Sequence, residues 1–66
     1  MNRMLRWFEY AHLPTELQRI SKPCGDLASK MDSELSESAE KTAGMRKLLE
    51  AKDCFVRANL PQELKV

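Results

Sequence analysis

Hydrophobic residues recur at helical spacing in the first half of this 66-residue chain. They follow steps of four, three, four, three and four positions: Leu13, Leu17, Ile20, Cys24, Leu27 and Met31. This heptad seam predicts a helix over residues 13–31, because positions three and four apart share one helix face. Pro14 suits its first turn, where a missing N–H costs no hydrogen bond. Pro23 lies inside this helix and is expected to kink it, since the carbonyl of Arg19 loses its donor.

The second half of the chain predicts a second helix with a wider apolar face. Residues 32–38 are short, polar and acidic, and we expect them to connect the two helices. The second helix is expected over residues 39–59, because Pro61 stops it. Its apolar arc consists of Met45, Leu48, Leu49, Phe55 and Val56. The narrow seam of the first helix cannot cover this arc, so the surplus apolar surface predicts an oligomer.

An N-terminal arm, residues 1–12, contains Trp7, Phe8 and Tyr10. Two interpretations of these aromatic residues stay open: a cap over the open end of the hairpin, or a platform that stacks a flat ligand. Residues 60–66 form a tail. The expected fold is a single all-α domain, an antiparallel helical hairpin with an N-terminal aromatic arm, assembled into a compact homo-oligomer. A chain this short usually needs such a partner to be stable.

Composition and charge narrow the function classes. The net charge is +1, which gives no general argument for nucleic acid, and no run reaches the length of a transmembrane helix. Residues 1–10 do not resemble a signal peptide, so we expect a reducing, cytoplasmic setting. Cys24 and Cys54 could pair if the two halves lie side by side, but they and His12 lack the spacing of a zinc site. We expect no metal and no cofactor.

Catalysis has little support, because the chain lacks an assembled nucleophile, base and orienting carboxylate. We therefore expect a protein that is not an enzyme, with His12 as a turn or capping residue. DNA binding through the second helix ranks below ligand binding, since Glu50 and Asp53 on its polar stripe would repel a phosphate backbone.

Two positions are candidates for anion binding. Lys52 lies in the middle of the apolar arc, where it is either a register-fixing or snorkelling residue or part of an anion site between protomers. Ser21 and Lys22 precede Pro23, and a hydroxyl beside a lysine at a kink can hold a phosphate.

Several strings of the sequence resemble those of small phage and prophage proteins. They are Phe8-Glu9-Tyr10-Ala11-His12-Leu13-Pro14, Ile20-Ser21-Lys22-Pro23, Glu40-Lys41-Thr42-Ala43-Gly44, Leu48-Leu49-Glu50-Ala51-Lys52-Asp53-Cys54 and Val56-Arg57-Ala58. Those proteins resemble in turn the helical hairpins of the anti-CBASS and anti-Thoeris sponges, which sequester cyclic-nucleotide signals of bacterial defence. The resemblance covers the chain from about Trp7 to Leu60, and Pro23 departs from the characterised sponges.

The resemblance implies a homohexamer with cyclic dinucleotides bound between protomers, and in some members cyclic trinucleotides at separate sites. It implies that Tyr10 stacks on a base and that Lys22, with Ser21 beside it, meets the phosphates. Thr42 and Arg46 are the matches to the second pocket of the family. The expected function is an oligomeric sponge that binds cyclic oligonucleotides in the cytoplasm of an infected host without cleaving them. The alternatives are a small adaptor that binds a host protein or DNA through the second helix, and a purely scaffolding hairpin.

Overall fold

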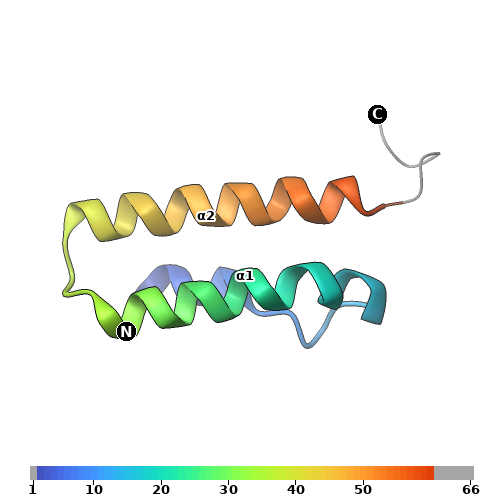
Figure 1. The fold of residues 1–66 in the computed structure, drawn as a ribbon, viewed down its shortest axis with the longest axis horizontal. Coiled ribbons are helices and arrows are strands. Elements are labelled where there is room, and N and C mark those ends of the chain that lie inside the picture. Colours follow the sequence, from blue (N-terminus) through green and yellow to red (C-terminus); the bar gives the residue numbers. More distant parts are fainter. Residues whose placement is uncertain (1, 61–66) are drawn as a thin grey trace.

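The computed structural model describes residues 2–60, which form a helical hairpin with a short helix packed against its side (Figure 1). The short helix is a 3-10 helix, η1, over Arg3–Phe8, and the long helices are α1, Thr15–Glu34, and α2, Ala39–Ala58. The two long helices run in opposite directions and contact each other, and η1 contacts both (Figure 1). Residues 2–60 contain no strand, so the prediction of an all-α hairpin is confirmed.

Helix α1 is longer than the apolar seam predicted. It begins at Thr15, directly after Pro14, and continues to Glu34, three residues beyond Met31. The N–H of Leu35 donates to the Met31 carbonyl at 3.1 Å and closes the last turn. The sequence indicated an end at Met31 because the apolar residues stop there, but a polar last turn that faces solvent can remain helical.

Helix α2 begins where the sequence predicted, after a shorter connection than expected. Residues 35–38 join the helices, and the Ser38 hydroxyl accepts a hydrogen bond from the N–H of Lys41 at 3.0 Å, which is an N-cap. The helix ends at Ala58, within a residue of the predicted end. Most of the predicted tail, residues 61–66, lies outside the described residues.

Pro23 lies inside α1 without ending it. Its side chain is exposed, so the ring faces solvent while the opposite side of the helix stays packed. The kink that we expected at this residue stays a prediction.

A small core lies where η1 meets the middle of the hairpin. Phe8, Ala28 and Met45 are buried, and partly buried side chains surround them: Met4, Leu5, Leu48 and Leu49. The buried residues of α1 are Ser21, Gly25 and Ala28, which share one face of small side chains. A Cβ added to Gly25 would lie 3.0 Å from the carbonyl oxygen of Phe8, so only glycine lets η1 approach this closely. The packing surface of α1 for η1 is therefore made by small residues.

The apolar seam of α1 is less buried than its small-residue face. None of the six seam residues is fully buried, and Leu27 is 46% exposed. The arm does not cap the open end of the hairpin. It starts beside the turn and follows the side of the hairpin (Figure 1), because the small-residue face offers the closest backbone approach. Apolar periodicity could not reveal that face, since serine and glycine do not count as apolar.

Three polar residues join α2 to the rest of the chain: Lys41 and Lys52 within the helix, and Asn59, its C-cap. We call them the polar line. Steps of eleven and seven residues place them at nearly the same angle around the helix. Each donates to a main-chain oxygen of another segment at 2.8–3.2 Å: Lys41 to Asp32 and Leu35, Lys52 to Trp7, and Asn59 to Glu16. This arrangement favours the interpretation of Lys52 as a residue that fixes register.

Lys41 also carries the ion pairs of the turn. Its side chain is only 4% exposed, and its ammonium contacts the carboxylates of Asp32, at 2.9 Å, and Glu37. The hydrogen bond that Lys41 donates to Glu37 and the two negative charges raise the pKa of Lys41. In return, the hydrogen bond from Lys41 lowers the pKa of both carboxyl groups. The N–H of Asn2 donates to Asp32 at 2.8 Å, which ties the start of the arm to the same cluster.

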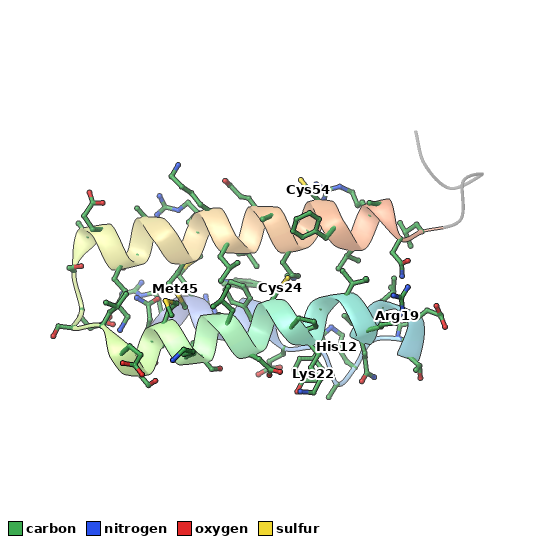
Figure 2. All side chains as sticks on the ribbon, viewed as in Figure 1. His12, Arg19, Lys22, Cys24, Met45 and Cys54 are labelled. Carbon is green, nitrogen blue, oxygen red and sulfur yellow. The ribbon has the colours of Figure 1, made fainter. Side chains whose placement is uncertain are left out.

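Both cysteines are free thiols. Cys24 is half-buried and lies between the two helices, while Cys54 is exposed on the outer side of α2 (Figure 2). Among residues 2–60, no helix is both long enough and apolar enough to cross a membrane.

Candidate functional site

The six residues singled out from the sequence fall on three separate surfaces, two on each. Tyr10 and Lys22 lie together beside the first half of α1, and Thr42 and Arg46 line a groove near the turn. Ser21 and Lys52 line a pocket between η1, α1 and α2. Each pair therefore comes together in space, but the three pairs do not form a single site within one chain.

The first surface joins an aromatic face to a cation. The ammonium of Lys22 lies 5.8 Å from the centre of the Tyr10 ring, within the range of a cation–π contact. The ring is held against α1 at Gly25, where an added Cβ would meet its edge at 3.5 Å. Lys22 points away from α2 on the outer side of the hairpin (Figure 2). A flat base could stack on the ring while its phosphate meets the ammonium.

Lys22 is not free in this arrangement. It forms a salt bridge with Asp26 at 2.8 Å, in which both side chains are 58% exposed. The hydrogen bond and charge of Asp26 raise the pKa of Lys22, so the lysine is a full cation at neutral pH. Exposed pairs of this kind contribute little to stability, so an incoming phosphate can displace the carboxylate at small cost. A hollow of about 210 Å³ opens beside the Tyr10 ring, with Asp26 and Ser29 in its wall.

The second surface is a groove of about 580 Å³ between the arm and the start of α2. Its lining consists of Asn2, Arg3, Met4, Glu37, Thr42 and Arg46. Arg3 and Arg46 are exposed, and among residues 2–60 no hydrogen bond or ion pair engages either guanidinium. Two unengaged guanidinium groups on one groove suit a phosphate, because each offers a planar set of donors.

Thr42 is only partly available to a ligand. Its hydroxyl accepts a hydrogen bond from the side-chain amide of Asn2 at 3.2 Å, so its own proton remains free to donate. The same amide lies 3.3 Å from Glu37, whose carboxylate is paired with Lys41. The negative charge of Glu37 is therefore partly neutralised by Lys41, so Glu37 repels a phosphate in this groove less than a free carboxylate would.

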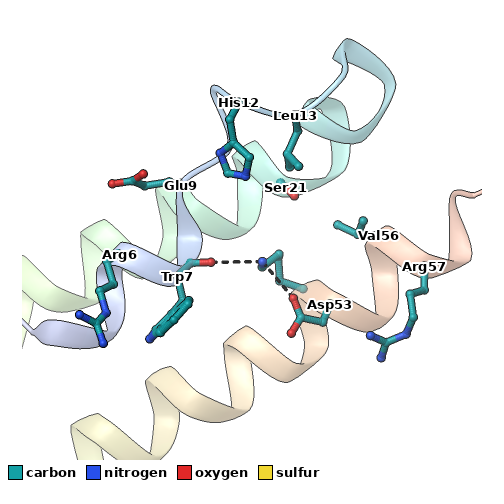
Figure 3. Close-up of a pocket in the computed structure, with 10 residues that line it drawn as sticks. Arg6, Trp7, Glu9, His12, Leu13, Ser21, Asp53, Val56 and Arg57 are labelled. Carbon is teal, nitrogen blue, oxygen red and sulfur yellow. Dashed lines mark hydrogen bonds and ion pairs between the residues drawn. The ribbon is translucent and has the colours of Figure 1, made fainter.

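The third surface is a pocket of about 460 Å³ at the junction of η1, α1 and α2 (Figure 3). Ser21 reaches it from α1 and Lys52 from α2, and Trp7 contributes from η1. The side chain of Lys52 is 13% exposed, and its ammonium lies 3.2 Å from the Trp7 carbonyl and 3.0 Å from the Asp53 carboxylate.

Three residues of these surfaces were not among the predicted candidates. Asn2, Arg3 and Arg6 lie in the arm, and the surfaces that they line depend on the path of the arm. The helical spacing of the polar line was visible in the sequence, but it did not show which segments these residues contact.

No group of three histidine, cysteine, aspartate or glutamate side chains within residues 2–60 is arranged to hold a metal ion. The three surfaces offer aromatic faces, hydroxyl groups and cations to a ligand. Comparisons of the chain with protein-family models, with curated proteins and with solved structures gave no match.

Proposed function

We propose that this protein is a bacteriophage anti-defence sponge that binds cyclic oligonucleotides and holds them without cleaving them. The observation that carries the proposal is the contact of the Tyr10 ring with the Lys22 ammonium, at 5.8 Å. A cyclic dinucleotide presents flat bases beside negatively charged phosphates, and its recognition needs a stacking surface next to a cation. The arm and α1 supply both on an exposed side of the hairpin.

The groove between the arm and α2 supports a second ligand surface. Arg3, Arg46 and Thr42 offer two guanidinium groups and a hydroxyl but no aromatic ring. Such a surface suits a ligand contacted mainly through its phosphates, and cyclic trinucleotides, with three phosphates, are the candidates. The two surfaces use different residues, so one protein could hold both ligand classes at once.

Association of several copies is part of the proposal, with a hexamer as the expected assembly. Four large apolar side chains are about half exposed in the single chain: Trp7, Leu27, Leu35 and Phe55. Burial of such side chains between copies is favourable by roughly 25 cal/mol for each Å² removed from water. A neighbouring copy would also deepen the shallow surfaces around Tyr10 and Arg46 into enclosed sites.

The proposed mechanism is competition for a messenger. An infected cell that uses CBASS-type signalling makes a cyclic nucleotide, and the sponge lowers its free concentration in the host cytoplasm. The effector is then not activated. Tight binding suffices for this task, so no catalytic residues are required.

A thermal-shift screen against cyclic di- and trinucleotides, with linear dinucleotides and ATP as controls, tests the proposal. At about 100 times its dissociation constant, a ligand should stabilise the fold by roughly 2.7 kcal/mol. Tyr10→Ala with Lys22→Ala should abolish the shift with cyclic dinucleotides, whereas Tyr10→Phe, which keeps the ring, should retain it. Lys30→Ala is the matched control, since Lys30 pairs with Glu34 on the same helix as Lys22 does with Asp26.

Two results would count against the sponge. One is a flat response across the whole panel, and the other is unchanged cyclic dinucleotide binding by the Tyr10 and Lys22 double variant. A flat response would favour the second candidate function, an adaptor that binds a host protein or DNA through α2. The observation behind that candidate is Phe55, which is 57% exposed on α2. An adaptor should lose its partner on Phe55→Ser and show no nucleotide-dependent rise in Tm.

A further inference from the structure

The pocket at the junction of η1, α1 and α2 contains none of the five residues that the proposed function assigns to cyclic oligonucleotides: Arg3, Tyr10, Lys22, Thr42 and Arg46. Its lining comes from three parts of the chain that the fold brings together: Arg6, Trp7, Glu9, His12, Leu13, Ser21, Lys52, Asp53, Val56 and Arg57 (Figure 3). Its volume of about 460 Å³ is in the usual range for a small-molecule site. Neither of the two ligand surfaces in the proposed function uses this pocket.

The hydroxyl of Ser21 is the most informative atom in this pocket. Ser21 is 1% exposed, and its Oγ has no hydrogen-bond partner. A buried serine on a helix ordinarily bonds to a main-chain carbonyl of the preceding turn, but this one does not. An unsatisfied buried hydroxyl opposes folding, and it is normally found only where something else compensates. A ligand oxygen or nitrogen in the pocket would provide the missing partner.

One cation inside the pocket keeps a donor for an anion. The ammonium of Lys52 has three donors, of which the Trp7 carbonyl and the Asp53 carboxylate take two. Arg57 also lines the pocket, but its guanidinium contacts the Cys54 sulfur at 3.4 Å, on the outer side of α2. The free donor for an anion is therefore that of Lys52.

The remaining charges limit how much negative charge the pocket accepts. Arg6 stacks over the Trp7 ring at 4.8 Å, and the acids Glu9 and Asp53 also line the pocket. Lys52 and Arg6 balance these two carboxylates, so the lining suits one phosphate group better than several. The Trp7 side chain is 53% exposed, so its indole ring is available to a second flat group.

We propose that this pocket binds a small anion in which one phosphate is joined to a flat heterocycle, the class of the nucleoside monophosphates. The phosphate contacts the Lys52 ammonium, the ring lies against Trp7, and a ligand polar atom bonds to the Ser21 hydroxyl. Because that hydroxyl is recessed, a half-buried neighbour, Leu13 or Val56, must shift to let the ligand reach it. The proposal does not depend on cyclic oligonucleotide binding, since it uses neither Tyr10 nor Arg46.

Trp7 is the only tryptophan of the chain, so its fluorescence reports on this pocket directly. We would titrate the protein with adenosine 5′-monophosphate, inorganic phosphate and adenosine. The monophosphate should give a saturable change in Trp7 fluorescence. Inorganic phosphate should bind with lower affinity than the monophosphate, and adenosine with the lowest affinity of the three. The signal should persist in the Tyr10→Ala, Lys22→Ala variant, which separates this site from the one proposed above.

Matched variants give the decisive comparison. Ser21→Ala should weaken monophosphate binding at least about tenfold and leave the Tm of the empty protein equal or higher, because it removes an unpaired hydroxyl. Lys52→Gln should weaken binding similarly, and Lys47→Gln, on an exposed lysine of the same helix, should not. If Lys52→Gln fails to fold, the comparison of the parent with Ser21→Ala decides by itself. The absence of a saturable signal, or equal affinity in the parent and Ser21→Ala, would overturn the proposal.

Discussion

The ammonium of Lys41 lies 2.9 Å from the carboxylate of Asp32, inside the turn that joins the two helices. Only 4% of the lysine side chain and 12% of the aspartate side chain are exposed, so this pair is shielded from water. All four polar partners of the ammonium lie within the last turn of α1 and the connection: the carboxylates of Asp32 and Glu37 and the carbonyl oxygens of Asp32 and Leu35. One side chain of α2 thereby fixes the path of the turn.

Replacement of this lysine should be the most damaging charge change on α2. Lys41→Met keeps the length of the side chain but leaves two carboxylates and two main-chain oxygens without their donor. We expect Tm to fall by more than about 5 °C for a domain of this size, measured by circular dichroism. Lys47→Met, at an exposed position of the same helix, should change Tm little. Equal Tm values for the two variants would contradict the role assigned to Lys41.

The same cluster should make the protein sensitive to acid. The pKa values of Asp32 and Glu37 lie below their ordinary values of 3.8 and 4.5, because Lys41 stabilises both anions. A lowered pKa in the folded state means that the folded protein binds fewer protons than the unfolded chain in this range. The contribution to stability is therefore complete above about pH 4.5 and is lost as the pH falls through the folded values.

Unfolding by urea at a series of pH values measures this loss. The free energy of unfolding should decline below pH 4.5 in the parent and decline less steeply in Asp32→Asn. Glu34→Gln is the control, since Glu34 pairs only with the exposed Lys30 at 3.6 Å and should leave the slope unchanged. A parent slope equal to that of Asp32→Asn would show that the ion pair does not form in solution.

The two glycines of the chain should respond in opposite directions to alanine. In Gly25→Ala, the new methyl group would meet the Phe8 carbonyl oxygen at 3.0 Å, and the arm would have to move, at a cost of about 1–3 kcal/mol. In Gly44→Ala, the methyl group would meet nothing within 4 Å, and the helix should gain about 0.5–1 kcal/mol. Urea denaturation of both variants checks this. Stabilisation by both substitutions would mean that η1 does not pack on α1.

Asn59 should hold the open end of the hairpin together. Its side-chain amide donates to the Glu16 carbonyl at 3.0 Å and accepts from Arg19 at 3.2 Å. Asn59→Ala should cost about 0.5–1.5 kcal/mol and speed amide hydrogen exchange in the first turn of α1 and the last turn of α2. Exchange near the turn should not change. If exchange rose equally throughout both helices, Asn59 would be acting on global stability and not on this end.

The hairpin itself could be predicted because apolar periodicity, the acidic connection and Pro61 mark two helices and their junction. The position of the arm could not. Its packing depends on Gly25 and Ser21. Their small side chains let the arm approach α1 closely, but nothing in the sequence marks them as packing residues. The buried state of Lys41 was also hidden, since a lysine at the start of a helix is usually solvated.

The residues of the candidate site could be predicted by chemical type, but not all of their partners could. Ser21 and Lys52 come from different helices, and only the fold brings them to one pocket. Arg3 lines the same groove as Arg46 only because of the path that the arm takes. Thr42 and Arg46 are four residues apart on one helix, so their proximity followed directly from helical spacing.

The polar line of α2 has a consequence for how this chain can change over time. Lys41, Lys52 and Asn59 all bind main-chain oxygens, and a main-chain oxygen is present whichever amino acid occupies the position. Substitutions at Trp7, Glu16 or Leu35 therefore leave these connections in place. Divergent descendants of this chain should keep three polar positions, spaced by eleven and seven residues. The amino acids of the segments that they bind should vary more freely.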